Sequence, residues 1–211
     1  MAELRHPRRP AILSPARAEA IIGDEDPAAA SGIAHSTAWA LLGIPDEDFD
    51  LEAITRLRSL VCAQGPDIVA HLWSRSPEFT LPGTLWRLHL FIEWCERDLP
   101  LVKDRYEVGR QAEIVPAGME ILSEVPLLES VIEDAKALLR GELTDDDLER
   151  VVVRAAIAMR VLAAGEGGEG SWITDPGDPL AHMVTTRARA LLKTAEELDL
   201  AGREAAFGNL E

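Results

Sequence analysis

Apolar residues recur with a helical period along most of this chain. Between residues 145 and 164 they return every three or four positions, while the polar residues Asp147, Arg150 and Arg154 fall opposite them. The apolar stripe consists of Leu148, Val151, Val152, Ala155, Ala158, Met159 and Leu162. Few segments alternate with the period of two that is typical of strands, so the pattern predicts an all-α fold.

Proline after a capping residue marks several of the expected helix starts. Asp26-Pro27 and Asp178-Pro179 are of this type, since proline needs no N–H partner at the first helical position. Thr144 followed by three aspartates is another start, because carboxylates stabilise a first turn. Helices are expected near residues 15–22, 27–42, 50–63, 66–75, 82–97, 100–111, 126–140, 145–164 and 179–200. The expected architecture is a single helical domain of about eight or nine helices.

The segment Leu85–Cys95 is apolar on every side of a helical wheel. Only Arg87, His89 and Glu93 interrupt it. A helix that is apolar all round belongs inside a protein, and this one is too short and too polar to span a bilayer. We therefore expect a buried central helix at about residues 81–97.

The chain of 211 residues is long enough for one large domain with a substantial core. We predict one all-helical domain over residues 14–211. Residues 1–13 are rich in arginine and proline and are expected to form a mobile arm. The glycine-rich residues 165–170 are expected to be a flexible loop within the domain.

The formal net charge of −16 narrows the expected partners. Such a surface repels phosphate backbones and anionic lipids, so it disfavours binding to nucleic acid or membranes. The two cysteines, Cys62 and Cys95, lie in apolar helical stretches, which is typical of reduced structural thiols. No apolar leader follows the N-terminal arginines, so the expected location is the cytoplasm.

One group of residues has the composition of a metal site. His89 and Glu93 are four positions apart and share a helical face, and His71 lies on the preceding expected helix. Two histidines and one carboxylate are a common set of metal ligands. The alternative is that His89 simply pairs with Glu93, and we weigh that pairing above a metal, since no HExxH motif is present. No cofactor is predicted.

Two further patterns suggest binding sites. Trp86 and Trp94 lie near one face of the central helix, where they would line an apolar cavity or fill the core. Trp172 and His182, in a segment approached by the glycine-rich loop, are additional ligand-binding candidates.

Residues 21–42 have the spacing of a helix-turn-helix motif. In that motif His35 and Ser36 would begin the recognition helix and contact DNA. Almost no lysine or arginine follows them, which weakens the motif.

These patterns rank three hypotheses about function. The leading one is a non-enzymatic regulatory module that binds a protein partner or an apolar small ligand, with a second copy of the chain as a candidate partner. The alternative is a metal-dependent enzyme that uses His71, His89 and Glu93. The third is a transcriptional regulator that uses residues 21–42.

Overall fold

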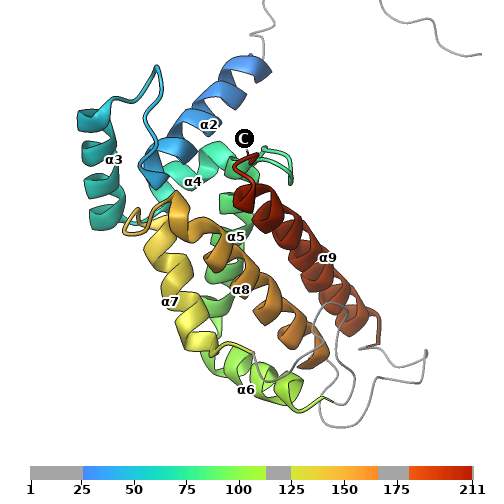
Figure 1. Cartoon of the computed structure of the whole chain (residues 1–211). Helices are drawn as coiled ribbons and strands as arrows, with labels where there is room; N and C mark the ends of the chain where they lie inside the picture. The colour runs from blue at the N-terminus through green and yellow to red at the C-terminus, as the bar shows by residue number, and fades with distance from the viewer. Residues whose placement is uncertain (1–25, 113–124, 166–180, 211) are drawn as a thin grey trace, which may run out of the picture.

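The computed structural model describes residues 26–112, 125–165 and 181–210, with side chains in the last range from residue 188 onward. Within these residues the chain is all-helical, which confirms the predicted fold class (Figure 1). The expected helix at 15–22 and the arm at 1–13 lie outside the described residues. The eight described helices are α2 (Pro27–Leu42), α3 (Leu51–Gln64), α4 (Asp67–Trp73), α5 (Leu81–Arg97), α6 (Leu99–Arg110), α7 (Leu128–Leu139), α8 (Asp145–Gly165) and α9 (Ala181–Ala206).

Side-chain caps begin four of these helices. Asp26 caps α2 by accepting a hydrogen bond from the Ala28 amide at 3.0 Å, with proline following it as predicted. Asp50, Thr80 and Asp98 cap α3, α5 and α6 in the same way. Each cap satisfies an amide that has no partner inside its own helix. Local chemistry therefore sets where these helices start.

Helix α5 is the central element that the sequence predicts. It packs against α2, α4, α6, α7 and α9, while α8 packs against α6, α7 and α9. Figure 1 shows α8 and α9 running side by side along one flank, with α3 at the opposite edge. The core contains Trp73, Leu85, Leu88, Met159 and Leu162, all almost fully buried. A continuous apolar core thus joins the helices into one body.

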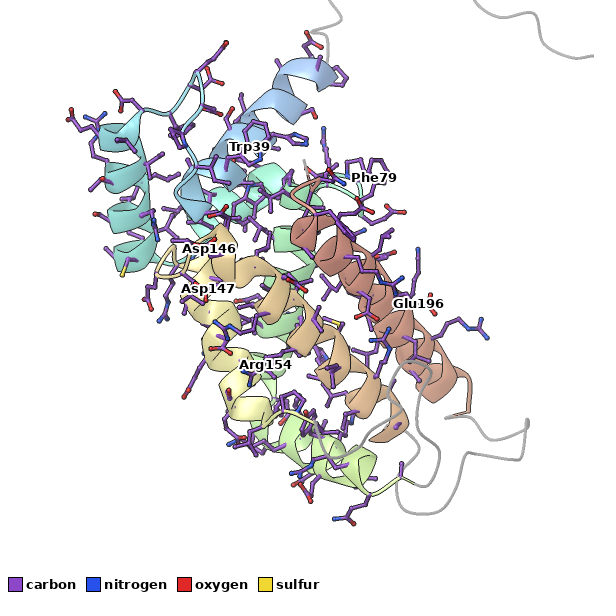
Figure 2. The ribbon with its side chains drawn as sticks, viewed as in Figure 1. Trp39, Phe79, Asp146, Asp147, Arg154 and Glu196 are labelled. Carbon is purple, nitrogen blue, oxygen red and sulfur yellow. The ribbon has the colours of Figure 1, made fainter. Side chains whose placement is uncertain are left out.

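Polar contacts join neighbouring helices around this core. Arg154 of α8, labelled in Figure 2, falls opposite the apolar stripe but is half-buried, and it lies 3.1 Å from Asp134 of α7. Arg58 of α3 donates to two carbonyl oxygens of the turn between α7 and α8, those of Gly141 at 2.5 Å and Leu143 at 3.0 Å. The two hydrogen bonds from the Arg58 guanidinium group therefore fix the position of α3 against that turn.

Helices α6 and α8 cross in backbone contact at two glycines. A Cβ atom added to Gly109 would lie 1.9 Å from the Val161 carbonyl oxygen, and one added to Gly165 would lie 1.9 Å from the Arg105 carbonyl oxygen. Gly165, which the sequence assigns to the flexible loop, is thus the buried last residue of α8. Residues 166–170 of that predicted loop lie outside the described part of the chain.

No helix in residues 26–112, 125–165 or 181–210 has the length and apolar character needed to cross a lipid bilayer.

Candidate functional site

Within the described residues, one group of possible metal ligands lies where α4 meets α5. Asp67, His89 and Glu93 each offer one ligand atom, and these three atoms all lie within 4.8 Å of one another. His89 Nε2 is 3.4 Å from Asp67 Oδ1. His89 and Glu93 share a face because they are one helical turn apart on α5, and Asp67 comes from the first turn of α4.

Burial differs sharply within this group. The His89 side chain is only 8% exposed, and its ring lies against Trp86 with the ring centroids 5.6 Å apart. The Asp67 side chain is 75% exposed, and Glu93 is also exposed. The imidazole is thus held by packing, while the two carboxylates keep access to solvent.

His71 does not belong to this group in the structure. It lies one turn beyond Asp67 on the short helix α4, and it is exposed. The sequence predicts that His71 joins His89 and Glu93, whereas the residue of α4 that lies with them is Asp67. The resulting set has one histidine and two carboxylates, where two histidines and one carboxylate are predicted.

A second candidate is an apolar pocket of about 270 Å³ between α5, α8 and α9. Leu90, Phe91 and Trp94 line it from α5, and Met159 lies at its α8 side. The remaining lining residues are Arg87, Ala190, Leu191 and Thr194. The pocket therefore offers mainly hydrocarbon and indole surface, with one hydroxyl group and one guanidinium group.

Carboxylates already balance the charge of the pocket's arginine. Arg87 Nε donates to Glu197 Oε2 of α9 at 2.5 Å, and one terminal nitrogen donates to the Gly83 carbonyl oxygen at 2.9 Å. The other terminal nitrogen lies 3.7 Å from Glu78. Because its positive charge is compensated, Arg87 is a poor receptor for an anionic ligand.

The tryptophans predicted to share a ligand face take different roles. Trp94 lines the pocket, whereas Trp86 is half-buried and lies against His89. Trp172 and the side chain of His182 lie outside the described part of the chain. Sequence reasoning missed the contributions of α8 and α9 to the pocket, because they depend on how distant helices pack.

The helix-turn-helix hypothesis does not fit α2. This helix runs without a break from Pro27 to Leu42, so no turn precedes His35 and Ser36. His35 Nδ1 donates to the Ser31 carbonyl oxygen at 2.8 Å, and the buried Ser36 hydroxyl donates to Asp48 at 3.0 Å. Both side chains therefore serve local structure, and residues 21–25 of the motif lie outside the description.

Neither cysteine combines the features of a catalytic nucleophile. Burial in the core raises the pKa of the Cys95 thiol to about 12, so the thiol stays protonated near neutral pH. Cys62 is exposed, and the side chain that its sulfur contacts, at 3.9 Å, is the carboxylate of Glu142 rather than a histidine.

Comparison with known proteins found no protein family, no curated protein and no solved structure that matches this chain.

Proposed function

We propose that this protein binds a neutral, largely apolar small molecule in the pocket between α5, α8 and α9. The observation that carries the proposal is the pocket itself, an apolar hollow lined by three helices and floored by buried Phe91 and Met159. Pockets of this kind, with a few polar groups on an apolar wall, are where proteins commonly hold small ligands.

The volume of the pocket indicates the size of the ligand. At about 270 Å³ it is close to twice the roughly 150 Å³ cavity that is known to take up benzene. A bicyclic aromatic compound or a medium-length alkyl chain matches this space. The hydroxyl group of Thr194 is a hydrogen-bonding partner for one polar atom of such a ligand.

The lining chemistry favours binding over catalysis. Within the described part of the lining, Arg87 is the one titratable side chain, and it is engaged by Glu197 and Glu78. Among the lining residues that the structure describes, none is a histidine, cysteine or carboxylate that could act as a base or nucleophile. The proposed role is therefore that of a cytoplasmic ligand-binding protein, in keeping with the leading hypothesis from the sequence.

The test combines native mass spectrometry of the purified chain with titration of a neutral fluorescent probe, N-phenyl-1-naphthylamine. Ala190→Phe places a ring at the pocket wall, and Ala206→Phe makes the same change at an exposed position of the same helix, outside the pocket. We expect one probe per chain, at least tenfold weaker binding by Ala190→Phe, and unchanged binding by Ala206→Phe.

The proposal fails if the parent chain binds no probe, or if Ala190→Phe binds it as tightly as Ala206→Phe does. A molecule of matching size that co-purifies with the chain in the native spectrum would identify the class of the natural ligand. The same spectrum reports the number of subunits, and so tests whether a second copy of the chain is a partner.

A further inference from the structure

We propose that Asp67, His89 and Glu93 form a site for a divalent transition-metal ion between α4 and α5. The three side chains come from two helices. His89 and Glu93 belong to the central helix α5, and Asp67 belongs to α4, a short helix packed onto it. None of the three lines the apolar pocket, so this site is independent of the proposed function.

The separation of the ligand atoms fits a bound ion. An ion with tetrahedral bonds of about 2.1 Å holds its ligands about 3.4 Å apart. His89 Nε2 and Asp67 Oδ1 are already separated by 3.4 Å. Glu93 lies within the 4.8 Å limit of the group, and its exposed side chain has the rotational freedom to close the remaining distance.

The carboxylates of Asp67 and Glu93 are available to bind an ion. Among the residues that the structure describes, neither Asp67 nor Glu93 pairs with a lysine or arginine. Glu96, three residues further along α5, pairs instead with Lys136 of α7. An acidic pair left without a cation beside a buried imidazole is the arrangement that a divalent ion completes.

The ligand types select a class of metal. An imidazole nitrogen suits zinc, cobalt and nickel, whereas magnesium and calcium prefer oxygen ligands alone. The two carboxylates balance the double positive charge of the ion. Because Asp67 and Glu93 face solvent, a fourth position is left for water, as in open zinc sites.

Packing already holds one of the three ligand residues, His89, in place. His89 is buried and its ring lies against Trp86, so the imidazole loses little further freedom when it binds an ion. Bound metal would join the first turn of α4 to the middle of α5, and so would stabilise that contact.

The experiment is titration of the full, untagged chain with Zn²⁺ by calorimetry and with Co²⁺ by visible absorption. All variants carry Cys62→Ser, which removes the one exposed thiol among the described residues that would compete for these ions. Asp67→Asn and Glu93→Gln change exposed side chains and should leave folding intact. Glu133→Gln removes an exposed carboxylate of α7 and serves as the matched control.

We expect one Zn²⁺ per chain, with affinity at least about tenfold lower in Asp67→Asn and in Glu93→Gln and unchanged in Glu133→Gln. Mg²⁺ in large excess should not displace Co²⁺. The proposal is overturned if the parent chain binds neither ion. It is equally overturned if the two site variants bind like the control, or if Mg²⁺ displaces Co²⁺, since then the imidazole is not a ligand.

Discussion

The contact between α6 and α8 allows a sharp test of the fold through one substitution, Gly109→Ala. A Cβ atom at residue 109 would lie 1.9 Å from the Val161 carbonyl oxygen, and Cβ contacts under 3.0 Å essentially never occur. The obstacle is the backbone of α8, which has no alternative rotamer. The two helices must therefore separate by about 1 Å, which weakens every contact along their shared face.

The expected loss of stability combines two opposing effects. Overpacking of this kind costs roughly 1–3 kcal/mol, and a rigid backbone obstacle places the cost at the upper end. Alanine in place of glycine inside a helix returns about 1 kcal/mol. Gly109→Ala should therefore lower the free energy of unfolding by about 2 kcal/mol, which lowers Tm by roughly 4–8 °C for a chain of this size.

Gly32→Ala is the matched control, because a Cβ atom at that exposed position of α2 would meet nothing within 4 Å. It should gain up to about 1 kcal/mol from helix propensity alone. Urea unfolding followed by circular dichroism measures both variants. The reasoning is refuted if Gly109→Ala is as stable as the parent, since the two backbones would then not be in contact at this point.

Three further predictions concern single side chains. Burial raises the pKa of Tyr106, the chain's one tyrosine, to about 12, so its ultraviolet titration midpoint should fall to about 10 in urea. The unfolded chain releases this proton at a lower pH than the folded chain does. The contribution of protonated Tyr106 to the free energy of unfolding is therefore present below pH 10 and lost between pH 10 and 12. Tyr106→Phe should reduce the fall in stability over this pH range, and an equal fall in the parent and the variant would contradict the burial. A thiol reagent should label one cysteine in the folded chain, the exposed Cys62, and two after unfolding; rapid labelling of Cys95 would place it outside the core. Arg58→Gln leaves two turn carbonyls without their donors and should cost about 1–3 kcal/mol in urea unfolding, and a loss under 0.5 kcal/mol would show that water replaces the guanidinium.

A helix start is predictable where it depends on residues within one turn of chain. Asp26 caps α2 directly before a proline, as the sequence predicts, whereas Thr80 and Asp98, which cap α5 and α6, were not among the predicted caps. The helix ends were less predictable because a glycine can either end a helix or allow close packing within one. The expected end of α9 was residue 200, but the helix continues through Gly202, which packs closely against Val153 of α8. Only the tertiary contact distinguishes a packing glycine from a helix stop.

In the candidate metal group, too, local helix geometry was predictable and tertiary packing was not. His89 and Glu93 were predictable as neighbours because helical geometry alone places them on one face. The third member was not, because Asp67 and His71 differ by one turn of α4. Which of them reaches α5 depends on where the two helices cross, and the crossing point is set by packing rather than by any local pattern.

The polar residues of α5 explain how an otherwise apolar helix makes polar contacts with two different neighbouring helices. Arg87 is engaged by Glu197 of α9, so the helix is tied to α9 beside the apolar pocket. His89 meets Asp67 of α4 on another face, where Glu93 extends a carboxylate toward the same point. Each interruption of the apolar pattern thus corresponds to a contact with a particular neighbouring helix. Burying ionisable groups is costly unless they are matched, and the two least exposed of these side chains, Arg87 and His89, each lie beside a carboxylate of a neighbouring helix.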